Sequence, residues 1–413
     1  MKQTKRKRND FLLILIGQII SLFGNTILRF SLSIKVLDQT GSVAIFGGIL
    51  ALSMIPTILL SAFGGILADR VNKRNIMVIL DGLTSLSIVI FALVFHFTGS
   101  ILSIAIIMMV LSVIQAFYQP SVQSSIPLLV EEKKLMMANG LVIQVNALAN
   151  LIGPIVGGIL YGFLGMEPIV YVSAICFFLS AVMEIFIRIP NVLADKTEGI
   201  LTIIKNDLGD AVYFLKNKQR ELLKLLLLIA GINLVLSAMI MVGLPYLIKI
   251  FLGLSNQLYG FAEAAMGIGS ILGGLCAGWV AKKIEFKRSY VFLIAAGITI
   301  LPMAIAVVSN QMVWLSYGII LVSVMLIMCF ATLFSVYGQT MVQKLTPVNM
   351  LGKLSSVVTV ISMCALPIGQ SIYGVIFNDI GNQSFFILFV VAIISVMIGL
   401  VSKSVLKRLV SKS

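Results

Sequence analysis

The side chains best placed to do chemistry are the few ionisable residues inside long apolar runs, namely Arg29, Asp81 and Glu263. A charge within the hydrocarbon of a membrane is costly, so such a residue usually marks a transport path or a buried ion pair. A carboxyl group whose pKa is raised by burial can take up a proton. These three residues are therefore the candidates for proton coupling.

Two of these positions also have a structural interpretation. Glu263 lies near the outer end of its apolar run, where it takes up a proton from outside or forms a permanent ion pair with Arg29 or Lys249. Asp81 follows Arg74 by seven residues, which is about two turns on one helix face. We expect Asp81 to be a partner of the bases at that end rather than a proton carrier.

The remaining ionisable residues predict neither an enzyme nor a metal site. Glu184 and Arg188 are four residues apart, the spacing of an ion pair within one helix. The single histidine, His96, ends the third apolar run, and no cluster of His, Asp and Glu or nucleophile elbow accompanies it. The four cysteines have no paired spacing, so neither a disulfide, a metal site nor a cofactor is expected.

A strongly polar turn separates two apolar runs at residues 65–74. It contains Gly65, Asp69, Arg70, Lys73 and Arg74. A tight cytoplasmic turn between two membrane helices needs a small residue for close packing, a carboxylate with nearby bases, and cations outside the hydrocarbon. The pattern predicts a tight hinge between two spans, whereas the bases alone would also suit a loop that only fixes topology.

A second pattern combines small residues with a proline in the apolar run at 136–163. Its members are Gly140, Ala149, Gly153, Pro154, Gly157 and Gly158. Small residues let a neighbouring backbone approach closely, and the proline removes a hydrogen bond and bends the helix. We expect a stiff, kinked seam against the opposite half of the protein, or a packing seam of a kind found in any polytopic protein.

The composition is that of a polytopic membrane protein. Of the 413 residues, 59% are apolar and 11% are charged, and the mean hydropathy is +1.09. A helix needs about 20 residues to cross the hydrocarbon layer, so this length accommodates roughly twelve spans.

The apolar runs fall into two groups of six. We predict spans at 11–37, 43–69, 74–97, 100–119, 136–163 and 168–188, and again at 221–252, 256–282, 287–309, 311–345, 350–378 and 382–406. Thr-Gly pairs at 40–41 and 98–99 predict tight outer turns. The organisation is an N-terminal bundle at 1–188, a polar linker at 189–220 with an amphipathic helix on the inner surface, and a C-terminal bundle at 221–413.

The distribution of basic residues predicts the orientation. All but three of the 30 lysines and arginines fall in segments assigned to the inner side, the exceptions being Arg29, Lys35 and Lys249. The net charge of +14 therefore reflects orientation in a bilayer and not binding of nucleic acid. Both termini are expected in the cytoplasm.

The second half repeats the first. The stretch 278–288 aligns with the polar turn at an offset of 213 residues, after a Gly273-Gly274 pair that matches Gly64-Gly65. Lys282 takes the position of Asp69, so the acid is lost. Duplicated halves of this kind place the substrate between two rocking bundles.

These motifs resemble those of the major facilitator superfamily. The turn at 65–74 resembles the loop between its second and third helices, with Asn72 where that family has glycine; asparagine tolerates the left-handed backbone. The seam at 136–163 resembles the antiporter signature of its exporters, with Ala149 replacing one glycine. Residues 116–130 and 138–140 are similar to the branch that holds bacterial macrolide efflux proteins and the enterobactin exporter.

The resemblance implies an all-α integral membrane fold, with twelve transmembrane helices in two six-helix bundles, and export in exchange for protons. It also implies that Asp69 holds the inward gate by contacting bases below it and the start of span eleven near 349–353. Many exporters of this family have an arginine in span four. Gln115 and Gln119 occupy that region here, so an arginine-based coupling scheme is not carried over.

In that superfamily, spans one, four, seven and ten line the substrate cavity. The polar residues of these spans include Gln18, Asn25, Gln115, Gln119, Asn233, Tyr337 and Gln339. A few hydrogen-bonding groups in a wall rich in Met and Phe suit bulky amphiphiles better than sugars or nucleotides. Hydrogen bonding between helices is the alternative role for these groups.

The sequence thus predicts a monomeric exporter in the bacterial plasma membrane that moves amphiphilic molecules, such as macrolides or other drugs, outward against protons. A siderophore exporter and a lysophospholipid or lipid flippase are the alternatives on the same fold, and sodium is an alternative coupling ion. A membrane sensor would need a sizeable soluble domain, and the longest polar segment has about thirty residues.

Overall fold

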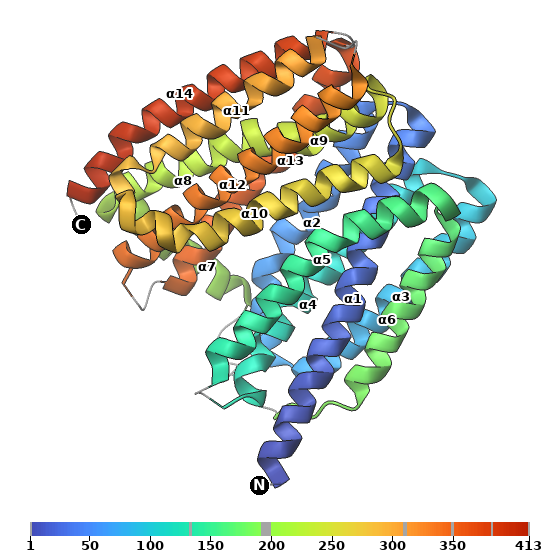
Figure 1. The fold of residues 1–413 in the computed structure, drawn as a ribbon. Coiled ribbons are helices and arrows are strands. Elements are labelled where there is room, and N and C mark those ends of the chain that lie inside the picture. Colours follow the sequence, from blue (N-terminus) through green and yellow to red (C-terminus); the bar gives the residue numbers. More distant parts are fainter. Residues whose placement is uncertain are drawn as a thin grey trace. The chain divides into compact units, whose positions relative to one another are not determined.

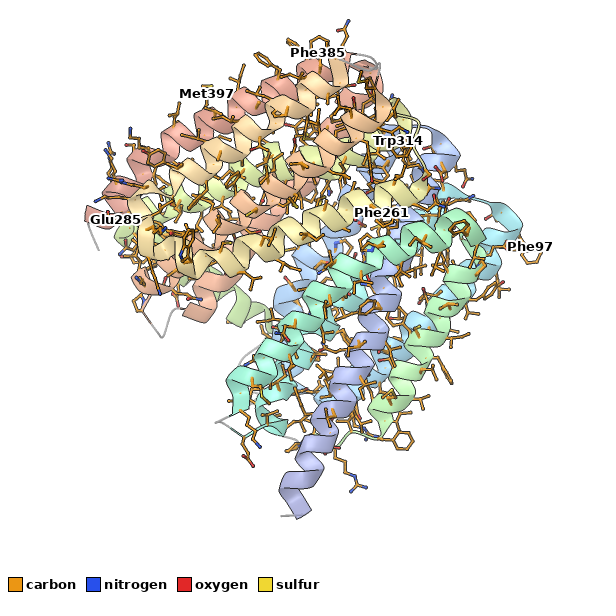
Figure 2. The ribbon with its side chains drawn as sticks, in the orientation of Figure 1. Phe97, Phe261, Glu285, Trp314, Phe385 and Met397 are labelled. Atoms are coloured by element: carbon orange, nitrogen blue, oxygen red, sulfur yellow. The ribbon has the colours of Figure 1, made fainter. Side chains whose placement is uncertain are left out.

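The computed structural model describes residues 2–131, 134–190, 200–308, 312–347, 351–380 and 383–411. The described chain is helical, without strands (Figure 1). It contains twelve helical segments that are long and apolar enough to cross a membrane, as predicted. Figure 2 shows side chains such as Phe97, Trp314 and Met397 on the outside of the helices, and these three are 58–83% exposed. Because apolar side chains cover the surface, the surrounding medium for these helices is lipid.

The first six spans are single helices. They are α1 (Lys2–Thr40), α2 (Val43–Arg70), α3 (Lys73–Thr98), α4 (Ile101–Leu129), α5 (Leu135–Leu164) and α6 (Glu167–Ile185). The helix in the linker is α7 (Ile200–Tyr213), which continues into a π-helical turn, η2 (Phe214–Lys218). The predicted linker helix is therefore present; residues 191–199 lie outside the described residues.

The seventh span is one helix interrupted by two π-helical segments. It comprises α8 (Arg220–Ile232), η3 (Asn233–Ser237), α9 (Ala238–Pro245) and η4 (Tyr246–Phe251). The last five spans are α10 (Asn256–Lys283), α11 (Tyr290–Val308) preceded by the short η5 (Phe286–Arg288), α12 (Val313–Leu345), α13 (Leu351–Ile380) and α14 (Ser384–Ser411). π-helical segments frequently occur at functional sites.

The chain divides into two compact units. Unit 1 comprises Met1–Thr40 and Leu52–Ile204, and unit 2 comprises Gly41–Ala51 and Lys205–Ser413. The first turns of α2 thus belong with unit 2, where they pack on α13: a Cβ atom at Gly47 would lie 2.5 Å from the carbonyl oxygen of Gln370. The assignment of the whole first bundle to 1–188 remains a prediction.

The two units repeat the same helix contacts. In unit 1, α6 packs on α1 and α3, and α3 packs on α4. In unit 2, α14 packs on α8 and α11, and α11 packs on α12. These are the corresponding pairs of each half, as the sequence repeat predicts, and Figure 1 shows α3 beside α6 and α11 beside α14.

Two details of the turns and ends follow from local chemistry. Gly41 and Gly99 have φ angles of 62° and 56°, the left-handed backbone that glycine adopts without strain, so a turn is present at both predicted places. The fourth span is longer than predicted: α4 continues past residue 119 to Leu129 although it contains Pro120 and Pro127. Proline is tolerated in membrane helices because neighbouring groups satisfy the freed backbone atoms.

Candidate functional site

The polar turn at 65–74 joins α2 to α3. Helix α2 ends at Arg70 and α3 begins at Lys73. Asn72 has φ −60° and ψ 113°, and its side chain accepts a hydrogen bond from the backbone N–H of Asn75. Asn72 is therefore the N-cap of α3 and has no left-handed backbone, unlike the expectation for a residue that replaces glycine. The side chain of Asp69 lies outside the described residues.

The close-packing glycine of this region is Gly64 and not Gly65. A Cβ atom at Gly64 would lie 2.0 Å from the carbonyl oxygen of Ala116 on α4, whereas nothing lies within 4 Å of one at Gly65. Unit 2 repeats the contact between α10 and α12, where a Cβ atom at Gly273 would lie 2.4 Å from the carbonyl oxygen of Cys329. The second helix of each half therefore approaches the fourth through a glycine.

The turn at the corresponding place in unit 2 has its own charge pairing. Glu285 forms an ion pair with Lys287, and Lys283 lies over the ring of Trp279 at 4.0 Å from its centroid. The Lys287 ammonium, which hydrogen-bonds Glu285, lowers the pKa of that carboxyl group. Although Lys282 replaces the acid of the first turn, the second turn thus carries an acid three residues later.

The small residues of α5 pack on α1 of the same unit. A Cβ atom at Gly153 would lie 2.3 Å from Oγ1 of Thr26, and one at Gly157 would lie 2.9 Å from Cδ1 of Phe30. Pro154 lies between them inside the helix. These two glycines thus serve the close approach of α5 to α1, and the seam against the opposite half stays a prediction. A Cβ atom at Gly140 would have no atom within 4 Å, and Gly158 is buried.

A partly buried polar network surrounds Arg29 in unit 1. The Arg29 guanidinium donates to Oδ1 of Asn25 at 3.2 Å and to Oγ of Ser112 at 2.9 Å. The Asn25 amide in turn donates to Oε1 of Gln115 at 3.3 Å. No described carboxylate pairs with Arg29. This cation is therefore held by neutral groups, which leaves its charge uncompensated inside the unit.

Asp81 and Glu184 are both buried in the interior of unit 1 beside Tyr118, and neither has the partner predicted from the sequence. The exposed fractions of Asp81 and Glu184 are 2% and 0%. Glu184 accepts a hydrogen bond of 2.7 Å from the hydroxyl of Tyr118, not from Arg188, and the Ser180 hydroxyl near Asp81 donates to the carbonyl oxygen of Gly17 at 3.2 Å.

Arg74, the expected partner of Asp81, instead donates to the carbonyl oxygen of Ile185. Contacts across α3, α4 and α6 therefore replace the pairs predicted along single helices. The expected Asp81–Arg74 and Glu184–Arg188 pairs are both wrong.

A small cavity lies beside this pair. Its lining includes Ser21, Asn25, Asp81, Thr84, Gln115 and Tyr118. Its volume accessible to the centre of a water molecule is about 20 Å³, which is enough for one water. The cavity thus connects the carboxylate of Asp81 with the Asn25 and Gln115 amides of the network around Arg29. Gln18, fully buried on α1, has no partner for either amide atom.

The remaining candidates have local hydrogen bonds. Glu263 on α10 accepts from the hydroxyl of Tyr259 at 2.5 Å, and Gln119 donates to Asn146 on α5 at 3.5 Å. Asn233 opens the π-helical segment η3, and its amide donates to the carbonyl oxygen of Ser362 at 2.8 Å.

Two further candidates, Tyr337 and Gln339, lie near the C-terminal end of α12. Tyr337 donates to the carbonyl oxygen of Ile284 at 2.8 Å and stacks on Phe286, so its contacts are with the turn between α10 and α11. Gln339 is exposed. No group of three His, Cys, Asp or Glu residues suited to a metal ion occurs in the described part of the chain.

Removal of the Tyr118 hydroxyl tests the importance of the buried pair for stability. In Tyr118→Phe, Glu184 loses its hydrogen-bond donor while both residues stay buried, and an unsatisfied buried acceptor costs about 1–3 kcal/mol. We expect a lower midpoint of thermal unfolding in detergent. Tyr171→Phe, at a site 51% exposed on α6, is the control and should unfold like the wild type. Equal midpoints for all three proteins would contradict this assignment.

The geometry defines a class of protein: an integral membrane protein of paired helical units with buried polar groups inside. A family model of the Major Facilitator Superfamily matches residues 14–337. The chain belongs to this superfamily, and it is a transporter of small molecules and not an enzyme.

Relatives and solved structures agree with this assignment. Macrolide efflux protein A of Streptococcus pyogenes is 21% identical over 98% of this chain and 100% of its own length. The MFS-type transporter YfiS of Bacillus subtilis is 25% identical over 96% of this chain and 93% of its own. A bacterial homologue of the iron transporter ferroportin, solved in an inward-facing state, has a TM-score of 0.74 at 17% identity, with 96% and 99% of the two chains covered. At this identity the solved structure shows the fold alone.

Proposed function

We propose that this protein exports amphiphilic small molecules, of the macrolide or drug class, across the bacterial plasma membrane in exchange for protons. The observation that carries this proposal is the match to macrolide efflux protein A over 98% of the chain and the whole of that relative. The twelve predicted spans of this chain and the predominance of bases in its predicted inner segments support a topology with both termini in the cytoplasm.

The polar groups inside unit 1 support this substrate class. Arg29, Asn25 and Gln115 form one hydrogen-bonded network, and Asn25 and Gln115 line a cavity together with apolar side chains such as Leu22 and Phe177. Few polar groups in an apolar wall bind an amphiphile through its hydrocarbon surface and fix its orientation by hydrogen bonds. We infer that Gln18 and Gln119 contribute from unit 1, and that Asn233, Tyr337 and Gln339 are the weaker candidates from unit 2.

The remaining roles follow from the motifs. We infer that Gly65, Asp69, Arg70, Lys73 and Arg74 form the gate motif, and that α5 with Gly140, Gly153, Pro154, Gly157 and Gly158 supports the exchange mechanism through its rigid packing. Proton uptake is assigned to buried ionisable residues, for which Asp81, Glu263 and Arg29 were the sequence candidates. The working unit is a monomer.

Accumulation of a labelled macrolide in cells tests the direction and the substrate class. A bacterium without its own macrolide exporters should accumulate less radiolabelled erythromycin when it expresses this protein than when it carries the empty vector. The difference should vanish on addition of a protonophore, because the proton gradient drives export. Equal accumulation, together with enrichment of a fluorescent lysophospholipid in one leaflet, would contradict drug export and favour a lipid flippase.

A further inference from the structure

The carboxylates of Asp81 and Glu184 are two like charges buried without a counter-ion. No described lysine or arginine forms an ion pair with either of them. Oδ2 of Asp81 and Oε2 of Glu184 have no hydrogen-bond partner among the residues that the structure describes. Two ionised carboxylates in this state would carry a large desolvation cost and would repel each other.

The groups packed around the pair are mostly neutral. Tyr118 on α4 donates to Glu184, and Ser180 on α6, near Asp81, donates to the carbonyl oxygen of Gly17 on α1. Helix α1 approaches through Gly17, where a Cβ atom would lie 3.3 Å from Oγ of Ser180 and 4.0 Å from Oε1 of Glu184. Among the described residues, these contacts bring the hydroxyl donor of Tyr118 to the pair but no positive charge.

The charged groups on the same helices are used elsewhere or lie further along. Those within about two and a half turns of the pair are Asp10 on α1, Lys73 and Arg74 on α3, and Arg188 after α6. Arg74 donates to the backbone of Ile185, and Arg188 is exposed. Asp10 is another buried acid and cannot neutralise the pair.

Binding of one proton lowers the desolvation cost and the repulsion of the two carboxylates. A protonated carboxyl group gains an O–H donor, so one acid of the pair then donates to a neighbouring acceptor and only one negative charge remains. We propose that Asp81 and Glu184 share a proton and form the proton-binding site of this transporter, with Tyr118 and Ser180 as its neutral neighbours. Glu184 was not among the sequence candidates for this role.

The two carboxyl groups differ in their access to the cavity, and so in their access to water and substrate. Asp81 lines it and Glu184 does not. Protons therefore exchange at Asp81, while Glu184 behind it sets how tightly the proton is held. Asn25 and Gln115, proposed here to contact the substrate, line the same cavity, so substrate binding and the proton on Asp81 influence each other. This coupling rests on the proposed function, whereas proton binding by the pair does not.

Infrared difference spectroscopy of the purified protein in lipid, without substrate, tests the pair directly. The C=O stretch of protonated carboxyl groups is followed as a function of pH in protein with Asp10→Asn and Glu263→Gln, because both residues are further carboxyl groups within spans. In this background we expect a band at neutral pH that is lost at alkaline pH. Asp81→Asn and Glu184→Gln should each leave one acid that titrates at lower pH, because the neighbouring negative charge is gone.

The double variant should lose the band altogether. The control is Glu167→Gln, which removes an exposed acid at the far end of α6, 3.4 Å from His96. This variant should leave the band unchanged. A band that persists in the double variant would overturn the proposal, as would single variants that titrate like the pair.

A second measurement needs no variant of the pair. The band should be the same in sodium chloride and in choline chloride at one pH; its loss in sodium would assign the pair to a metal cation and overturn the proton site. Since no substrate is present, a failure of drug export would leave these results unaffected.

Discussion

Gly64→Ala is expected to destabilise the protein and to impair transport. The added methyl group would lie 2.0 Å from the carbonyl oxygen and 3.0 Å from the carbonyl carbon of Ala116, and 3.1 Å from the Cα atom of Phe117. All three are backbone atoms, which do not move aside as a flexible side chain does. Helix α2 must therefore shift away from α4, and overpacking of this kind costs about 1–3 kcal/mol. Because α2 leads directly into the gate motif, we expect the shift to reach that motif.

The neighbouring glycine provides a matched control. Gly65→Ala adds the same methyl group to the same helix, where nothing lies within 4 Å of it. Its midpoint of thermal unfolding in detergent should equal or slightly exceed that of the wild type, because alanine favours the helix over glycine. If both variants unfold at the wild-type temperature, the close approach of α2 to α4 at Gly64 is not what the structure indicates.

Asp69→Asn is expected to abolish macrolide export without loss of the protein from the membrane. Asp69 is the one acid in a turn with Arg70, Lys73 and Arg74, and it lies at the carboxyl end of α2. Lys73 is only 7% exposed at the first position of α3, where the helix dipole opposes a positive charge. A carboxylate in this turn offsets that positive potential, and the amide keeps the size of the side chain but not its charge. Accumulation of labelled erythromycin should return to the level of the empty vector.

The control for this variant is an acid in the same position of another helix. Asp379 is the penultimate residue of α13, as Asp69 is of α2, and it is exposed. Asp379→Asn should export like the wild type. Normal export by Asp69→Asn at wild-type protein levels would refute the gate role of this acid.

The positions of the spans could be predicted because the bilayer imposes one simple pattern. Long apolar runs separated by short polar turns give the same twelve helices in the structure. The turns at Gly41 and Gly99 could also be predicted, because a turn of this kind requires only the left-handed backbone that glycine adopts without strain. The end of α4 could not be predicted in this way. Pro120 and Pro127 suggest a helix end in water, but in this protein they are accommodated between packed helices.

The candidate site was predicted in its parts but not in its connections. Asp81 stood out as a carboxyl group within a span, yet its contacts with α6 depend on packing between segments about a hundred residues apart. The hydrogen bond from Tyr118 to Glu184 joins residues 66 apart, and the spacing of Glu184 and Arg188 pointed to a simpler pair along one helix. The available signal was an acid and a tyrosine on spans that must pack together. Similarly, the motif spacing pointed to Gly65 as the close-packing residue, and only the packing of α2 on α4 identifies Gly64 instead.

Exchange of a macrolide for protons in inverted membrane vesicles tests the central claim most directly. Respiration acidifies the interior of such vesicles, and a pH-sensitive dye reports the gradient while macrolides, lipophilic cations and siderophores are added in turn. An exporter that exchanges drug for protons should move the macrolide inward and release protons, so the interior becomes less acidic in vesicles with this protein and not in those with Asp69→Asn. A gradient that stays constant with every compound while labelled macrolide stays outside would contradict the account.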